Sequence, residues 1–396
     1  MKLLHTADWH LGQTFYEYER REEHLVFLAW LGAQIKEREV DLLLIAGDLF
    51  DTQNPSAEAQ KIYYSFLRDI TAENPQLQIV IIAGNHDSAA RLEAPNPLLE
   101  AMNVTVRGVV RKTVDGDIDY DNLIIPLSKG GVCLAVPYLR QGDYPHAASY
   151  AEGVQSLYSD LIERATERGE SPIIAMGHLQ ATGSEISERD KSERTIIGGL
   201  EAVSPAAFDG GVAYTALGHL HRAQRVSGCE NVRYAGAPLP MSFAEKHNKQ
   251  GVTLVSIDQQ TSIERLEFDA PIKLISIPSE PMLLKDVLEE IATLPDGEVD
   301  SKSPFLEVKV LITEPEPSLR RDIEVALEGK AVRLTRLEAV VKRNKGEEPK
   351  ILTYEELQQI DPINMATDIF KRKFGGDDMP HEMKKMLNGV ITELER

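Results

Sequence analysis

The stretch Lys2-Leu3-Leu4-His5-Thr6-Ala7-Asp8-Trp9-His10 joins a short apolar run to an acidic and an imidazole side chain. Lys2 to Thr6 has the length and composition of a buried strand. Four later apolar runs also lead into polar residues: Gly47-Asp48-Leu49-Phe50-Asp51, Gly84-Asn85-His86-Asp87, Gly177-His178 and Gly218-His219-Leu220-His221. The pattern therefore predicts an α/β fold in which the strands carry chemistry at their carboxyl ends.

Helical patterns alternate with these strands through the first 270 residues. Leu25, Leu28, Leu31 and Ile35 recur at helical spacing, and a second helix is expected over 57–70. Further short apolar runs, typical of buried strands, cover 42–46, 78–83, 132–136, 173–176, 212–217 and 252–257. We therefore expect a layered α/β core over 1–270, with two packed sheets or one large sheet.

The rhythm changes near residue 270. Strands expected over 272–277, 306–312 and 332–341 alternate with helices over 283–294 and 318–327, which predicts a small α+β domain over 271–345. A polar linker follows, and 351–396 is expected to be helical, with an apolar stripe that includes Met383 and Met386. This stripe either packs on its own domain or docks on a partner.

Composition limits the classes of protein to consider. The 396 residues carry a formal net charge of -20, which by itself argues against binding to a phosphate backbone. Two cysteines cannot build a disulfide framework, and no apolar run reaches the length of about 18 residues that a transmembrane helix needs. Because charge occurs early at the N-terminus, a signal peptide is not expected either. We expect a cytoplasmic protein without membrane association.

The polar clusters suit a centre of two divalent cations. Parallel strands bring their carboxyl ends to the same edge of a sheet, so the five clusters should meet there. We expect Asp8, His10 and His221 to hold one cation, Asp48 to bridge both, and the second to be completed by Asn85, His178 and His219. Oxygen and nitrogen ligands without thiolate favour Mn²⁺, with Fe²⁺, Zn²⁺ or Mg²⁺ as alternatives.

His86 remains outside this ligand set. Beside the cations and oriented by Asp87, it is a candidate to protonate a leaving oxygen or to hold a phosphate. Asp51 is expected to orient a ligand through a hydrogen bond. Each motif alone is more often a structural turn or cap, so the prediction depends on the whole set.

Candidate contacts to nucleic-acid phosphates lie outside the polar clusters. Arg91 follows the third cluster, and the segment 330–345 carries six cationic residues against Glu338 alone. Arg333, Arg336, Lys342 and Arg343 belong to this segment, which is either a phosphate-binding stripe or a solvated strand face.

The ordered set of motifs resembles the calcineurin-like metallophosphoesterases. Within them, Leu4 to Gly12, Gly47 to Thr52 and Tyr234 to Phe243 are similar to the bacterial SbcD family. The resemblance implies a two-sheet core, a capping domain for DNA recognition over 271–345, and helices over 351–396 that bind the coiled coil of an SMC-like ABC ATPase, SbcC. It further implies a homodimer within a heterotetramer.

The same resemblance implies an activity. That activity is a Mn²⁺-dependent, ATP-dependent 3′–5′ double-strand DNA exonuclease and single-strand or hairpin endonuclease in DNA repair, recombination and replication. One position departs from archaeal and eukaryotic relatives, which often carry a second histidine where this chain has Asp51. A mechanism with two catalytic histidines is therefore not expected.

Two other functions compete with a nuclease. A small-molecule phosphodiesterase or phosphatase could use the same cations, but it would not need the domains after residue 270. A scaffold that binds metal or DNA without turnover would have no use for His86.

Overall fold

The protein is described from a computed structural model. It describes residues 1–185, 202–226, 228–313 and 316–341, together with 366, 367, 370, 379–381 and 383–387 of the C-terminal segment. The chain forms two compact units, Met1–Val340 and Val341–Arg396.

The first sheet has six strands in the order β14-β13-β1-β4-β5-β6. Its strands are β1 (Lys2–Thr6), β4 (Leu42–Ala46), β5 (Gln78–Ile82), β6 (Val104–Arg107), β13 (Gly251–Ile257) and β14 (Thr261–Glu267). The pairs from β1 to β6 are parallel, whereas β13 is antiparallel to both β1 and β14. Parallel pairing brings the carboxyl ends of β1, β4 and β5 to one edge.

The second sheet also has six strands, in the order β11-β12-β10-β9-β8-β7. They are β7 (Ile124–Pro126), β8 (Val132–Ala135), β9 (Ile173–His178), β10 (Val212–Gly218), β11 (Gln224–Arg225) and β12 (Val232–Tyr234). Strands β8, β9, β10 and β12 are parallel. The expectation that all five polar clusters lie at the edge of one sheet is therefore wrong: three follow strands of the first sheet and two follow strands of the second.

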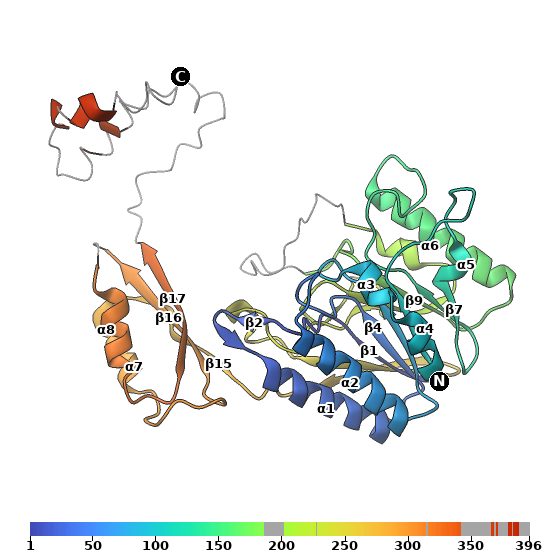
Figure 1. Cartoon of the computed structure of the whole chain (residues 1–396), viewed down its shortest axis with the longest axis horizontal. Helices are drawn as coiled ribbons and strands as arrows, with labels where there is room; N and C mark the ends of the chain where they lie inside the picture. The colour runs from blue at the N-terminus through green and yellow to red at the C-terminus, as the bar shows by residue number, and fades with distance from the viewer. Residues whose placement is uncertain are drawn as a thin grey trace. The chain divides into compact units, whose positions relative to one another are not determined.

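Helices cover the outer faces of both sheets (Figure 1). Helices α1 (Arg21–Arg38) and α2 (Ala57–Glu73) share an apolar cluster with the first sheet, and α6 (Tyr150–Glu167) shares one with the second. A third cluster, mostly of small and branched side chains, lies between the sheets. The predicted two-sheet α/β core is confirmed.

Short elements connect these layers. They are β2 (Thr14–Phe15), β3 (Tyr18–Glu19), α3 (Ala89–Glu93), α4 (Asn96–Leu99), η1 (Glu100–Met102), α5 (Tyr120–Leu123), η2 (Pro205–Phe208) and η3 (Phe243–Glu245). Trp9 is fully buried in edge-to-face contact with Phe27 and Phe66, so it packs the core directly beside the first polar cluster.

A three-stranded sheet, β15-β16-β17, follows the core. Two helices alternate with its strands in the predicted order: β15 (Leu274–Met282), α7 (Leu284–Ala292), β16 (Phe305–Ile312), α8 (Leu319–Ala326) and β17 (Arg333–Val341). It has its own apolar cluster, which includes Val287, Leu306 and Ile323. Phe305 packs on Phe15 of the β2–β3 hairpin. The domain boundaries at 270, 345 and 351 stay predictions.

Most of the predicted C-terminal helices lie outside the described residues. Of the apolar stripe, Met383, Met386 and Leu387 are described; Met383 and Met386 are exposed, and Leu387 is partly buried. The side chains of Met383 and Met386 are therefore open to solvent in the second unit. Among the residues that the structure describes, no helix is long and apolar enough to cross a membrane.

Gly218 ends β10 where the two sheets approach closely. An added Cβ would lie 1.9 Å from the carbonyl oxygen of Ala46 at the end of β4. We expect Gly218→Ala to lower the free energy of unfolding by about 1–3 kcal/mol, as overpacking does. Chemical denaturation measures this change.

Gly32 in α1 provides the matched control. An added Cβ there meets Ile70 Cδ1 at an ordinary 3.5 Å. Because alanine favours a helix over glycine, Gly32→Ala should be neutral or stabilise by up to about 1 kcal/mol. Equal destabilisation by both substitutions would contradict the close approach at Gly218.

Candidate metal centre

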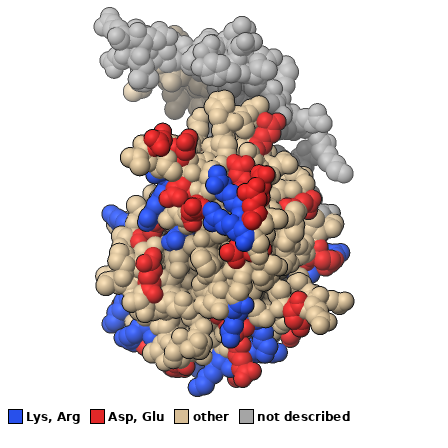
Figure 2. Space-filling view, turned by 90° about the vertical axis from the view of Figure 1, so that its right-hand side faces the viewer, with Lys and Arg blue, Asp and Glu red and all other residues tan. Residues whose placement is uncertain are grey.

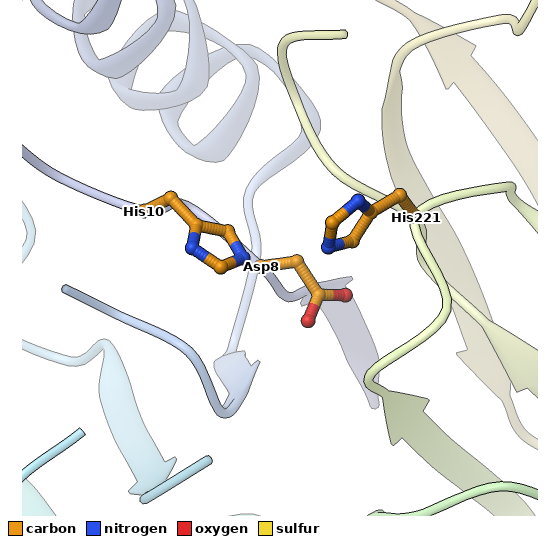
Figure 3. A group of neighbouring side chains, drawn as sticks. All are labelled: Asp8, His10 and His221. Carbon is orange, nitrogen blue, oxygen red and sulfur yellow. The ribbon is translucent and has the colours of Figure 1, made fainter. Parts of the chain in front are cut away.

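Asp8, His10 and His221 converge from the ends of two sheets (Figure 3). Asp8 and His10 follow β1 of the first sheet, and His221 follows β10 of the second. All three are buried, and one ligand atom from each lies within 4.8 Å of the others. Asp8 Oδ2 and His10 Nε2 are buried without a hydrogen-bond partner within the described part of the chain. Buried polar atoms are rarely left unpaired, so this arrangement fits a cation between them.

A second group gathers around Asp48 at the end of β4. Asp48 Oδ2 lies 3.3 Å from His178 Nε2 and 3.7 Å from His10 Nε2, so Asp48 faces both groups. Asn85 Oδ1 lies 3.0 Å from His178 Nε2 and 3.1 Å from His219 Nδ1. The structure thus brings together all seven residues that the sequence assigned to two cations.

Hydrogen bonds at Nδ1 direct three of these imidazoles. Nδ1 of His178 donates to the Ala46 carbonyl at 2.8 Å. Nδ1 of His10 donates to the Asp51 carboxylate at 3.2 Å, and Nδ1 of His221 donates to the Glu245 carboxylate at 3.3 Å. Each donation leaves Nε2 as the acceptor facing the cluster, which is the tautomer that a metal ligand needs.

Glu245 was not found by sequence reasoning. Besides His221, it accepts a bond from the backbone N–H of Met241 at 2.9 Å. A buried glutamate in η3, far along the chain from every polar cluster, has no spacing signal that would have revealed it.

His178 presents its acceptor nitrogen to two acceptor oxygens, one from Asn85 and one from Asp48. Such a contact requires a proton or a cation between the atoms. Burial opposes protonation, but the charge of Asp48 and the hydrogen bond to it outweigh burial and raise the pKa of His178 to about 9. Burial likewise opposes ionisation of Asp48, yet the charge of His178 holds the Asp48 pKa well below its usual value.

The two carboxylates are buried without a lysine or arginine partner within ion-pair distance in the described part of the chain. One oxygen of each is already used: Asp8 Oδ1 accepts from the N–H of His219 at 2.9 Å, and Asp48 Oδ1 accepts from the N–H of His86 at 2.8 Å. Burial raises the pKa of Asp8. Such negative charge in the interior is costly unless cations balance it, which again fits divalent metal.

Backbone strain gathers at the same place. Asp8, His10, Asp48 and His219 have φ values of 55°, 47°, 49° and 99°, in the left-handed region that favours glycine. Each such residue costs about 1–3 kcal/mol, and such strain is typical of functional sites. Here it turns the side chains sharply off the strand ends toward the cluster.

Comparisons with known proteins agree with this geometry. Residues 1–223 match the family described as calcineurin-like phosphoesterase, and residues 271–374 match a family described as Type 5 capsule protein repressor C-terminal domain. The SbcD subunit of the SbcCD nuclease from Rhodobacter capsulatus is 38% identical over 357 residues, which cover 85% of this chain and 87% of that protein. The chain belongs to the SbcD family of calcineurin-like phosphoesterases.

Other relatives carry the same name. The Escherichia coli K12 protein is 30% identical over 417 residues, covering 99% of this chain and 97% of that protein. The Bacillus subtilis protein is 33% identical over 272 residues, covering 64% and 66%. Among solved structures, Pseudomonas putida nuclease MPE has 17% identity and a TM-score of 0.21, covering 46% of this chain and 64% of that chain, a likeness too weak to carry an argument. As a member of the SbcD family, the chain is a metal-dependent hydrolase that binds divalent cations.

In this SbcD-family chain, His86 lies beside the cluster but is oriented differently from the prediction. Its ring centroid is 4.8 Å from that of His10, and its Nδ1 donates to the Asp51 carbonyl at 2.8 Å. Asp87 instead accepts backbone N–H bonds from Leu49, Phe50 and Gly84 at 2.8–3.1 Å. The expectation that Asp87 orients the His86 ring is therefore wrong, because its carboxylate joins the loops after β4 and β5.

Two cations of the candidate phosphate-binding stripe, Arg333 and Arg336, have partners within the small sheet. Arg333 is buried: its Nε donates to the Ser303 carbonyl at 2.8 Å, and its guanidinium lies 4.1 Å from the Phe305 ring centroid. Arg336 pairs with Glu307 at 2.9 Å and Glu338 at 3.5 Å. Both cations are engaged within the small sheet, and their contact with DNA stays a prediction.

The remaining candidates for DNA contact differ in status. Arg91 is exposed and donates to Asn54 Oδ1, so it stays a candidate. Lys342 and Arg343 lie outside the described residues. On the face of the molecule in Figure 2, cationic and acidic side chains are interspersed, so the net charge of -20 does not make this face uniformly acidic.

Proposed function

We propose that this SbcD-family protein is a DNA nuclease that hydrolyses phosphodiester bonds with two divalent cations. The observation that carries the proposal is the pair of donor groups that share Asp48, which faces His10 at 3.7 Å and His178 at 3.3 Å. The relatives named as nuclease subunits support DNA as the substrate.

In this proposal, Asp8, His10 and His221 hold one cation, and Asn85, His178 and His219 hold the other, with Asp48 between them. The cations would polarise the phosphate and lower the pKa of a water. Asp51 and Glu245 keep His10 and His221 in the ligand tautomer through their Nδ1 protons. Asp87 holds the two loops that carry Asp48 and Asn85.

His86 is proposed to donate a proton to the leaving oxygen. Its Nδ1 proton is held by the Asp51 carbonyl, so Nε2 is the atom that exchanges the proton with substrate. The ring is only partly buried, unlike His10 and Asp8, which leaves it open to a substrate.

We propose Mn²⁺ as the working metal, since the donors are carboxylate, amide and imidazole without thiolate. Calorimetric titration of the metal-free protein should show two sites for Mn²⁺. Comparison with Zn²⁺, Mg²⁺ and Fe²⁺ in the activity assay tests the choice of metal.

The function is tested with Mn²⁺ on linear duplex DNA, single-stranded DNA, hairpin DNA and a chromogenic phosphodiester. We expect cleavage of DNA, with duplex degradation from the 3′ end and ATP dependence once the ATPase partner is present. Turnover of the small ester with intact DNA, even with the partner added, would instead establish a small-molecule phosphodiesterase.

Asp51→Ala tests the support of the first cation. Loss of the carboxylate frees the His10 ring, whereas the backbone carbonyl that holds His86 remains. We expect Mn²⁺ affinity to fall by about 10–100-fold, as is typical when a metal ligand loses its orienting partner. Calorimetric titration measures this, and unchanged affinity in the variant would refute the role of Asp51.

We propose that residues 351–396 bind an SMC-like ABC ATPase, SbcC, and that two copies of each subunit assemble in bacterial DNA repair, recombination and replication. The exposed Met383 and Met386 and the names of the relatives support this docking. Truncation before Ile351 should abolish co-purification with the ATPase while Mn²⁺-dependent cleavage of single strands persists. Co-purification at the full-length level would reject it, and light scattering measures the stoichiometry.

A further inference from the structure

A cavity separate from the metal centre lies where the last strands of the two sheets approach each other. It has a volume of about 550 Å³ and is lined by parts of β11, β12, β13 and β14 and by the segment between η3 and β13. None of the proposed metal ligands is among its described lining residues. Arg222 lines it directly after His221, whose ring faces the metal cluster, so one loop separates the two sites.

The cavity is cationic in an otherwise acidic chain. Arg222, Arg233, Lys249 and Arg265 line it, against Glu185 as the single carboxylate among the described lining residues. Gln224 and His247 add further polar groups.

Three of the four cations are paired at the rim. Arg222 pairs with Glu185 at 2.8 Å, Arg233 with Glu230 at 3.1 Å and Lys249 with Glu267 at 2.6 Å. The pairs of Arg222 and Lys249 are solvent-exposed, and Glu230 is the exposed partner of a partly buried Arg233. Such pairs at the surface are weak, so an incoming anion can compete for the cations.

Arg265 differs from the other three. It projects from β14 between the sheets, where Nη1 donates to the Ala235 carbonyl at 2.7 Å and Nη2 to the Lys249 carbonyl at 3.0 Å. Its Nε is buried without a hydrogen-bond partner, and no carboxylate lies within ion-pair distance among the described residues. Burial lowers the pKa of Arg265 to about 10.

Arg265 is partly buried, and its guanidinium has no carboxylate within ion-pair distance among the described residues, so it can accept a further anionic partner. Phosphate oxygens are among the best complements of a guanidinium. The cavity volume falls in the range of small-ligand sites, about 300–1,000 Å³, which accommodates a nucleotide. We propose that this cavity binds a nucleotide phosphate through Arg265, Arg222 and Arg233. The phosphate belongs either to a free mononucleotide or to a nucleic-acid strand. The site goes beyond the proposed nuclease function and does not depend on it.

Calorimetry on the full chain in EDTA tests the proposal, because phosphate cannot then bind through metal. The probes are inorganic phosphate, dAMP and a single strand of ten thymidines. We expect dAMP or the strand to bind. Arg265→Gln and the double variant Arg222→Gln/Arg233→Gln should each weaken that binding by about tenfold or more, the effect of losing a charge-assisted hydrogen bond. The double variant leaves both backbone contacts of Arg265 intact, so it reports on binding even where Arg265→Gln disturbs folding.

Arg225→Gln is the matched control. Arg225 lies beside Gln224 on β11 and pairs with Glu230, but it does not line the cavity. This variant should bind as the wild type does. Binding of dAMP supports a free mononucleotide, and binding of the strand without dAMP supports a strand phosphate. No binding of any probe, or binding unchanged in the double variant, overturns the proposal, whether or not the protein cleaves DNA.

Discussion

His86→Ala should lower the kcat of Mn²⁺-dependent phosphodiester hydrolysis by about 10²–10⁴-fold, the usual contribution of a positioned general acid. The bound metal should remain, because none of the hydrogen bonds that orient His10, His178 or His221 involves the His86 ring. The measurement pairs steady-state kinetics on a single-stranded substrate with metal content by atomic emission. The kcat for a phosphodiester whose leaving group has a low pKa should fall less in this variant, because such a leaving group needs little protonation.

The matched control is His146→Ala, which removes an exposed imidazole outside the cluster and should leave kcat unchanged. If His86→Ala retains full turnover, or loses turnover only because metal is lost, then His86 is not the proton donor.

Asp8→Asn should abolish metal-dependent activity and yet stabilise the metal-free protein. Asp8 is fully buried, and burial raises its pKa, so its charge is unfavourable when no cation is present. Asparagine retains an oxygen for the His219 N–H and replaces the unpaired Oδ2 by a donor that can face the neighbouring imidazoles. We expect a gain of about 0.5–2 kcal/mol in EDTA, the usual size of such a trade between stability and function.

Denaturant unfolding in EDTA measures that gain, and titration with Mn²⁺ measures the lost site. Asp69→Asn is the control, since Asp69 is an exposed carboxylate in α2 paired with Arg68; it should change neither quantity. Destabilisation of the metal-free protein by Asp8→Asn would show that the Asp8 carboxylate stabilises the fold without a cation, contrary to the expected cost of its buried charge.

The net negative charge of the chain is weaker evidence against binding to a phosphate backbone than composition alone suggests. Part of the charge of -20 comes from Asp8 and Asp48, which face the proposed cations rather than solvent. Cationic side chains expected to bind phosphate, such as Arg336, are paired with glutamates in the small sheet. Other cations gather in a cavity between the two sheets instead, around Arg265.

Much of the fold could be predicted because the periodic signals are local. The strand from Lys2 to Thr6 and the run from Leu42 to Ala46 have the predicted bounds. The seven proposed ligands were found because each lies at or just after the carboxyl end of such a strand, so their places in the chain already indicated that they meet. Glu245 and the partly buried Arg265 gave no such signal.

The sequence by itself determined the α/β order, the ligand types and their positions at strand ends, since hydrophobic periodicity and strand–turn chemistry depend on neighbours in the chain. Only the tertiary structure decided that two sheets share the site, that the Asp51 carbonyl rather than Asp87 holds the His86 ring, and that Arg333 packs on Phe305. The physical reason is that hydrogen-bond partners and burial depend on residues that meet only when distant segments pack together.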